Sequence, residues 1–443
     1  MTIRKSYPQM KVKVIGAGLA GCEAAYNLAR RGIKVELYDI KPESFTPAHS
    51  DKNFGELVCS NSLKSNDIYA NACGLLKEEM RTLGSVTMDA AECSKVPAGG
   101  ALAVEREKFA QIITQKIKEN PNIEVICKEV EKVPNEWCIV ATGPLTTDAL
   151  SQSIRDICGG QLHFYDASAP IISRESIDFS KCFYGDRYGK GGDDYINCPL
   201  SKEEYLNFVD ELTKAERVIL HDFERKEIFE GCMPVEVMAS RGVDSLRFAM
   251  LKPVGLTDKD GNKFYAVLQL RKENAAGTAY NLVGFQTNLK WGEQKRVFSM
   301  IPALCQAEFL RYGVMHRNTF INSPTCLNKD FSLKSNGQVF FAGQITGVEG
   351  YVESAASGIL AALNLYEKLN GRTPDILDDT CVLGALSAHI AGANDNFQPM
   401  NANFGILKPA EMRIRDKKQR YAYLAERALK TVKQYKENNK DLF

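Results

Sequence analysis

The feature that most constrains this chain is a strand–turn–helix–strand pattern at its start. Residues 12–16 (VKVIG) predict a short buried parallel strand, because Val and Ile fill it and a glycine ends it. The turn GAGLAG at residues 16–21 leads into a helix-compatible segment that ends at Gly32. A second strand, IKVELYD, then places Asp39 at its carboxyl end. This order of elements is typical of a nucleotide-binding α/β unit.

Each glycine of the turn has a physical reason to be there. Gly16 allows the tight turn, Gly18 lets backbone N–H groups approach a pyrophosphate, and Gly21 lets the helix pack closely on the strand. The carboxylate that follows can accept hydrogen bonds from a ribose diol, and it lies 23 residues after the first glycine. A GxGxxG motif alone is weak evidence, but the whole unit predicts dinucleotide binding. The predicted cofactor-binding residues are Gly16, Ala17, Gly18, Leu19, Ala20, Gly21 and Asp39.

Two later segments favour FAD over a nicotinamide dinucleotide as the bound cofactor. NEWCIVATGP (135–144) predicts a short apolar strand stopped by Thr-Gly, where backbone can pass beside a cofactor. Residues 337–369 predict a strand, a glycine-rich turn and a long helix whose N-terminus favours an electron-rich ring edge. These segments resemble the glutathione-reductase type of flavoprotein, although βα units that merely pack are the alternative. They add Gly143, Gly343, Gln344 and Tyr351 to the predicted cofactor site.

The middle of the chain has a different character and predicts an inserted domain. The segment KEEYLNFVDELTKAERV (202–218) predicts a helix with Ser201 as N-cap, and YAVLQLR (265–271) and YNLVGFQT (280–287) predict strands. The expected fold is therefore α/β, a two-dinucleotide-fold FAD-binding domain with an α+β insertion domain. We expect residues 1–172 and 325–443 to form the FAD-binding domain, the second part with a basic C-terminal helix. Residues 173–324 form the insertion, which contributes to an RNA and folate cleft.

Charge is balanced overall but unevenly distributed. The formal net charge is +1, yet residues 241–317 carry 12 basic and 6 acidic side chains and residues 408–441 carry 11 and 5. Such patches fit contact with RNA phosphates, although a charge run is more often a solvated helix face. The candidate phosphate or folate-glutamate contacts are Arg271, Lys272, Arg296 and Arg317.

Composition excludes several classes of protein. No apolar run is long enough to cross a bilayer, and MTIRKSYPQMK lacks the apolar stretch of a signal peptide. Thirteen cysteines without a C-x-x-C pair argue against a disulfide framework or a tetrathiolate zinc site. We therefore expect a cytoplasmic protein with no metal and no membrane contact, as a monomer or dimer.

Two cysteines stand apart from the others by their setting. Cys59 lies in the polar segment NFGELVCSNSLKSN, and Cys232 lies in FEGCMPVEVMASRG, where the backbone bends around Gly231 and Pro234. Either thiol can have thiolate character where cations or N–H donors lie close. The remaining cysteines in strand or helix patterns read as small apolar side chains.

Several long blocks carry a resemblance to a known family. LVCSNSLKSN, VPAGGALAVERE, EGCMPVE, NAAGTAYNLVGFQTNLKWGEQKRVF, RYGVMHRNTFINSP and GVEGYVESAASG closely resemble the folate- and FAD-dependent tRNA (uracil-C5) methyltransferases of the TrmFO type. The resemblance runs from about residue 12 to residue 430. It implies FAD as cofactor, methylenetetrahydrofolate as one-carbon donor, NAD(P)H as reductant and structured RNA as partner.

The resemblance also implies roles for the two thiols. One thiol adds to C6 of a T-loop uracil and the other removes the proton from C5, which we assign to Cys232 and Cys59 respectively; the two roles can be exchanged. FAMLKPVGL stands where FGPMKPVGL is common, so a uracil of 23S ribosomal RNA remains an alternative target. From other classes, an FAD-dependent oxidoreductase should carry a close cysteine pair, and a non-catalytic FAD protein would not need both thiol motifs.

Overall fold

The computed structural model describes residues 11–46, 48–160, 162–189, 192–218, 233–394 and 397–443. Its centre is a five-stranded sheet in the order β16-β7-β1-β2-β6, in which every neighbouring pair is parallel. The strands are β1 (Lys11–Ile15), β2 (Lys34–Asp39), β6 (Ile123–Cys127), β7 (Cys138–Val140) and β16 (Val339–Phe341). The carboxyl ends of parallel strands share one edge, and ligands bind at that edge in open α/β sheets.

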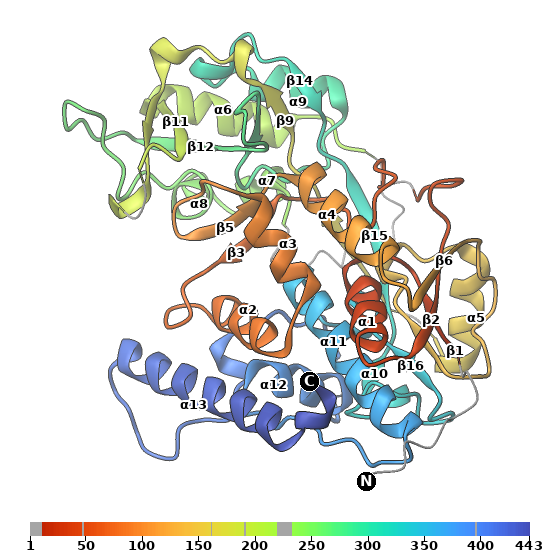
Figure 1. The fold of residues 1–443 in the computed structure, drawn as a ribbon. Coiled ribbons are helices and arrows are strands. Elements are labelled where there is room, and N and C mark those ends of the chain that lie inside the picture. The colour runs from red at the N-terminus through yellow and green to blue at the C-terminus, as the bar shows by residue number, and fades with distance from the viewer. Residues whose placement is uncertain (1–10, 47, 161, 190–191, 219–232, 395–396) are drawn as a thin grey trace.

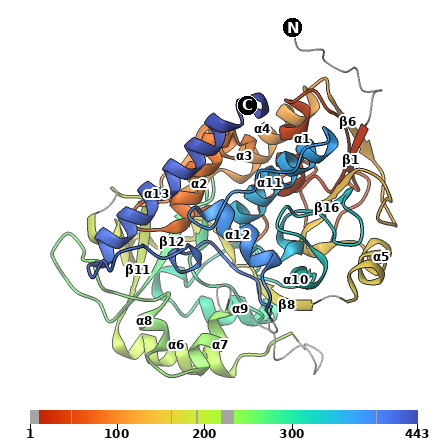
Figure 2. The same cartoon turned by 90° about the horizontal axis from the view of Figure 1, so that it is seen from below.

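Helices cover this sheet and extend away from it (Figure 1). They are α1 (Leu19–Ala29), α2 (Ala72–Leu83), α3 (Val86–Ser94), α4 (Arg106–Lys118), α5 (Asp148–Cys158), α10 (Ser323–Cys326), α11 (Tyr351–Leu369), α12 (Val382–Ala391) and α13 (Lys417–Asn438). The long C-terminal helix α13 runs beside α2, as Figure 2 shows. A small sheet of β3 (Ser62–Ser65), β4 (Lys95–Val96) and β5 (Ala101–Val104) lies between these helices and the insertion.

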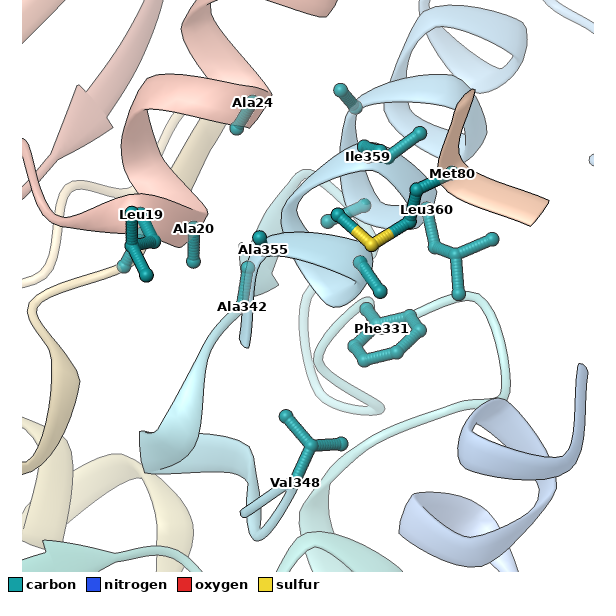
Figure 3. Close-up of a cluster of buried hydrophobic side chains, with 14 of the residues drawn as sticks. Leu19, Ala20, Ala24, Met80, Phe331, Ala342, Val348, Ala355, Ile359 and Leu360 are labelled. Carbon is teal, nitrogen blue, oxygen red and sulfur yellow. The ribbon is translucent and has the colours of Figure 1, made fainter. Parts of the chain in front are cut away.

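The main hydrophobic core joins the first and last parts of the chain. Helices α1 and α11 pack against each other through small side chains such as Ala20 and Ala355, and Met80 of α2 fills the space behind α11 (Figure 3). The contact is close, because a Cβ added to Gly358 would lie 2.2 Å from the backbone oxygen of Ala20. Burial of these apolar surfaces fixes the late helix beside the glycine turn of the early unit.

The insertion has a sheet and a core of its own. Its antiparallel sheet has the order β10-β11-β12-β13-β9-β14, with β9 (Ile171–Ser173), β10 (Phe183–Gly185), β11 (Tyr195–Leu200), β12 (Ala266–Lys272), β13 (Ala279–Leu282) and β14 (Phe309–Arg311). Helices α6 (Lys202–Lys214), α7 (Val235–Ser240), α8 (Ser245–Phe248) and α9 (Trp291–Phe298) accompany it. A separate cluster that includes Tyr205, Phe208, Phe285 and Phe298 forms its core. The antiparallel pair β8 (Leu162–Ala167) and β15 (Met315–Phe320) connects the two parts.

Most expected elements are present, with shifted ends. The predicted helix at 202–218 is α6, and Ser201 caps it in a capping box with Glu204, but the helix stops at Lys214. The strand predicted over 280–287 ends at Leu282, since the chain turns there and Gly284 has φ +81°. No helix in the described residues is long and apolar enough for a membrane span.

Candidate active site

The glycine turn lies at the carboxyl edge of the parallel sheet. Gly16 has φ +97°, and a Cβ there would lie 2.6 Å from the backbone oxygen of Ala141. A Cβ on Gly21 would lie 1.7 Å from the backbone oxygen of Gly16, so helix and strand touch through bare backbone. At Gly18, the N-cap of α1, an added Cβ meets nothing within 4 Å. Gly16 and Gly21 therefore allow close packing of backbone on backbone, while Gly18 faces open space.

Asp39 closes the turn from the neighbouring strand. Its Oδ2 accepts a hydrogen bond from the backbone N–H of Ala17 (2.6 Å), and its Oδ1 accepts one from Lys41 N–H (2.9 Å). Each carboxylate oxygen retains a lone pair for a further donor. The donor set of this corner, backbone N–H groups beside a carboxylate, fits the pyrophosphate and ribose of a dinucleotide.

A cavity of about 400 Å³ opens in front of the turn. Its volume lies within the usual range for small-molecule sites. Among the predicted cofactor residues it is lined by Gly16, Ala17, Gly18, Leu19, Ala20, Asp39, Gly143, Gly343, Gln344 and Tyr351, whereas Gly21 is covered by backbone. Cys59 lines the same cavity. The structure thus brings together residues as far apart in the chain as Ile15 and Asn401.

Cys59 and Tyr351 meet at the rim of the cavity. The backbone N–H of Cys59 donates to the phenol oxygen of Tyr351 at 2.7 Å, and the Cys59 Sγ lies 3.0 Å from that oxygen. Burial, followed by the charge of Cys59, raises the pKa of Tyr351 well above its ordinary value. A phenol that keeps its proton and accepts an N–H bond can direct that proton toward the sulfur.

Sequence analysis did not find an ion pair whose carboxylate is buried near this contact. Glu353, on the first turn of α11, is fully buried and accepts from the Lys64 ammonium at 3.1 Å. The same carboxylate oxygen accepts from the backbone N–H of Ala402 at 2.9 Å. Lys64 itself has φ +63°. The pair joins residues 289 apart in the chain, and no spacing in the sequence signals such a contact.

Lys77 anchors the segment that follows Cys59. Its fully buried ammonium donates to the backbone oxygens of Leu63 (2.6 Å), Lys64 (3.3 Å) and Ser65 (2.6 Å). Burial lowers the pKa of Lys77 to about 8. This lysine thus satisfies three carbonyls on β3 that no neighbouring helix backbone reaches.

The predicted basic contacts need correction. Arg271 is not a surface ligand: it is 7% exposed and donates to Asn61 and Ser60. Arg296 is engaged in surface ion pairs with Glu211 and Glu293. The backbone oxygen of Lys272 accepts a hydrogen bond from the Asn61 side chain.

Two further predicted residues cannot be placed in the site. Cys232 lies outside the described residues, as does the rest of 219–232. The backbone of Arg317 belongs to β15, but its side chain is outside the description. Downstream of Cys232, the backbone N–H of Val235 donates to Gln286 O at 2.7 Å, and Gln286 lines the cavity.

Comparison with known proteins identifies the family. The model described as glucose inhibited division protein A matches residues 11–373. The methylenetetrahydrofolate–tRNA-(uracil-5-)-methyltransferase TrmFO of Acetivibrio thermocellus is 57% identical over 428 residues, which cover 96% of this chain and 98% of that protein. The enzyme of the same name from Ligilactobacillus salivarius is 52% identical, with 97% and 99% covered.

A solved structure extends the comparison to the fold. The GidA structure of Aquifex aeolicus superposes with a TM-score of 0.72 at 15% identity, and the match covers 98% of this chain but 74% of the GidA chain. The FAD-binding α/β fold expected from the sequence is thereby confirmed. The chain belongs to the TrmFO family, within the wider group described as glucose inhibited division protein A.

Proposed function

We propose that this protein is an FAD-containing enzyme that methylates C5 of a uracil in tRNA with methylenetetrahydrofolate as one-carbon donor. Relatives more than half identical over nearly their whole length carry this activity in their names. The observation that carries the proposal is the position of Cys59, whose thiol lines the dinucleotide cavity and contacts Tyr351. A nucleophilic or basic sulfur beside a flavin site is what this chemistry requires.

The chemistry begins from the poor nucleophilicity of uracil C5. A thiolate adds to C6, forming an S–C6 bond and leaving an enolate whose C5 bonds to the one-carbon unit. A base then takes the C5 proton, the S–C6 bond breaks, and the C5–C6 double bond is restored. Bound FAD, recharged by NAD(P)H, would supply the two electrons that make a methylene unit into a methyl group.

We assign Cys232 as nucleophile and Cys59 as base. The contact between Cys59 and the Tyr351 hydroxyl gives this thiol a partner for proton exchange. Cys232 precedes Val235 by three residues, and the backbone N–H of Val235 donates to Gln286, which lines the cavity. Only a short stretch of chain therefore separates Cys232 from a residue bonded to the cavity lining. The remaining residues would hold parts of FAD: the glycine turn would bind the pyrophosphate, and Asp39 would bind the ribose.

RNA contact is assigned to exposed cations that have no place in the cavity. The segment before α13 and the first turn of that helix present five exposed basic side chains, Lys408, Arg413, Arg415, Lys417 and Lys418. Cations that neutralise phosphates make affinity fall with rising salt, whatever the base sequence. We therefore expect RNA binding, but not FAD binding, to weaken strongly between low and physiological salt.

The decisive experiment supplies the protein with methylenetetrahydrofolate and NADH or NADPH. Separate reactions contain unmodified tRNA or 23S ribosomal RNA transcripts, and nucleoside analysis measures 5-methyluridine. We expect the product in tRNA, and its loss in Cys59→Ala and Cys232→Ala variants that keep FAD. Cys305→Ala is the matched control, since that cysteine is exposed and does not line the cavity. Methylation of ribosomal RNA alone, or full activity in either cysteine variant, would overturn the corresponding part of the proposal.

A further inference from the structure

The loop that carries Cys59 has no strand or helix of its own to fix it. Residues 56–61 lie between irregular chain and the start of β3. Backbone groups outside a ladder must be bonded elsewhere, and a loop without such bonds would not hold a thiol in one place. The groups that bond this loop therefore decide where the sulfur lies.

The N-terminal side of the loop is held by Arg106, the first residue of α4. Its Nη1 donates to the backbone oxygens of Leu57 (2.8 Å) and Val58 (2.9 Å), directly before Cys59. The other edge of the same guanidinium donates to Glu273 through Nε (2.7 Å) and Nη2 (3.3 Å). Burial lowers the pKa of Arg106, but the charge of Glu273, the hydrogen bond to it, and interactions with Tyr351 and Cys59 together raise the pKa above its ordinary value.

The C-terminal side of the loop is held by Arg271, at the end of β12. Its Nη2 donates to the Ser60 hydroxyl and its Nε to Oδ1 of Asn61, both at 2.8 Å. Asn61 returns a bond from Nδ2 to the backbone oxygen of Lys272, also at 2.8 Å. The guanidinium fork thus spans two consecutive residues after Cys59, a geometry that a point-charge ammonium cannot reproduce.

These contacts all lead to three consecutive residues of the insertion domain. Arg271 and Glu273 are each 7% exposed, so the bonds form where water does not compete. On the opposite side, Tyr351 receives the Cys59 N–H and faces the sulfur. Among the described residues, the charged and titratable groups around this loop include Arg106 of α4, Arg271 of β12, Glu273 just after it, Arg311 of β14 and Tyr351 of α11. Lys41 forms an ion pair with Glu56 at the start of the loop.

We propose that Arg106, Arg271, Lys272 and Glu273 form a clamp, the β12 clamp, through which docking of the insertion domain positions the Cys59 thiol. Arg106 and Arg271 are then positioning residues, since they act on the loop and not on the substrate. The catalytic meaning of the clamp rests on the proposed function. Its existence does not, because thiol reactivity and loop mobility can be measured without any methylation.

The first test removes the buried ion pair as a unit. The double substitution Arg106→Gln and Glu273→Gln removes both charges of this pair, while Arg271 keeps its hydrogen bonds to Ser60 and Asn61. FAD content and melting temperature are compared with the wild type to check folding. The rate of Cys59 alkylation by iodoacetamide is then followed against pH by site-resolved mass spectrometry. Arg106 interacts directly with Cys59, so the loss of this cation, only partly offset by the loss of the Glu273 charge, should raise the pH of half-maximal rate. The exposed pair Arg296→Gln with Glu211→Gln is the control, and we expect no shift from it.

A second variant keeps the result decisive if the double variant does not fold. Arg271→Lys retains the buried charge but cannot reach both Ser60 and Asn61. We expect amide hydrogen exchange over residues 57–61 to become at least tenfold faster, with exchange in α1 unchanged. Wild-type exchange in this loop together with a wild-type alkylation profile would overturn the clamp.

Methylation measured on the same variants separates the two proposals. If the clamp and the proposed function both hold, 5-methyluridine formation falls at least tenfold in kcat while the KM for RNA is unchanged. Altered alkylation and exchange in the variants, combined with a wild-type protein that makes no 5-methyluridine, would support the clamp and refute the function. Normal alkylation and exchange with lost methylation would refute the clamp and leave the function in place.

Discussion

Two glycines of the same turn should respond in opposite ways to the same added methyl group. At Gly21 a Cβ would lie 1.7 Å from the Gly16 oxygen, against the 3.0 Å that real Cβ atoms keep. The first turns of α1 must therefore move from β1 by roughly 1.3 Å, into a closely packed core. At Gly18 the added Cβ has no neighbour within 4 Å, and φ −72° and ψ −173° suit alanine.

The expected magnitudes follow from these geometries. Adding a methyl group to a closely packed core costs about 1–3 kcal/mol, and more where the group meets rigid backbone. Replacing a helical glycine by alanine offsets about 1 kcal/mol of this through higher helix propensity. We expect Gly21→Ala to lower the free energy of unfolding by about 2 kcal/mol or more. Gly18→Ala should cost less than about 1 kcal/mol as an N-cap change, yet weaken FAD binding at least tenfold, about 1.4 kcal/mol, by occupying the phosphate side of the turn.

The two effects are measured separately. Denaturant titration of flavin-free protein reports the fold without the stabilisation that a bound ligand adds, and titration with FAD reports binding. Gly18→Asp extends the series, because its carboxylate would repel the diphosphate and should leave the purified protein colourless. The reasoning is refuted if Gly21→Ala is as stable as the wild type, or if Gly18→Ala and Gly18→Asp bind FAD normally.

Three further predictions concern buried and capping groups. Lys77→Met keeps the buried stem but removes the ammonium that bonds three carbonyls, of which Leu63 keeps only a weak donor in Cys73, so denaturant titration should show a loss of about 3 kcal/mol; an unchanged midpoint would contradict the role of its ammonium. Burial raises the pKa of Glu79 to about 7, although the amides of Val382 and Leu383 oppose this. Because the folded pKa lies above the unfolded value of 4.5, the stability that this carboxyl contributes is present below pH 4.5 and is lost as the pH rises to about 7. The free energy of unfolding of the wild type should therefore fall by about 3 kcal/mol relative to Glu79→Gln over this range. Parallel curves of stability against pH for the two proteins would contradict the raised pKa. Ser201→Ala should lower the free energy of unfolding of the insertion by about 1 kcal/mol, and an unchanged value would mean that the capping box does not stabilise α6.

The dinucleotide unit could be predicted because its signals are local. A β-branched strand, a glycine turn and a helix of small residues each limit the backbone within a few positions. The predicted strand at 12–16, the strand within 135–144 and the strand–turn–helix at 337–369 correspond to β1, β7, and β16 with α11. These segments also line the cavity, so the same local patterns predicted residues that the fold brings together around it.

The basic contacts could not be predicted because charge in a sequence does not report burial. Arg271 was expected on the surface of a cleft, yet its strand enters the interface and its fork meets a loop 210 residues earlier in the chain. Arg106 and Glu273 are 167 residues apart. Such pairs depend on how the insertion lies on the FAD-binding domain, which local periodicity does not determine.

Polar contacts join the two parts of the chain, and this has a consequence for function. Besides the β12 clamp, Tyr195 donates to the Ala98 oxygen at 3.1 Å and the Gly99 N–H donates to Asp194 at 2.7 Å, whereas the two large apolar cores remain separate. Hydrogen bonds fix relative position sharply, but each contributes only about 1 kcal/mol of net stability. Such an interface can place a thiol accurately and still open at modest cost, as interdomain contacts of this kind do. A site that must admit one base of a folded RNA, and release it after methylation, needs both properties.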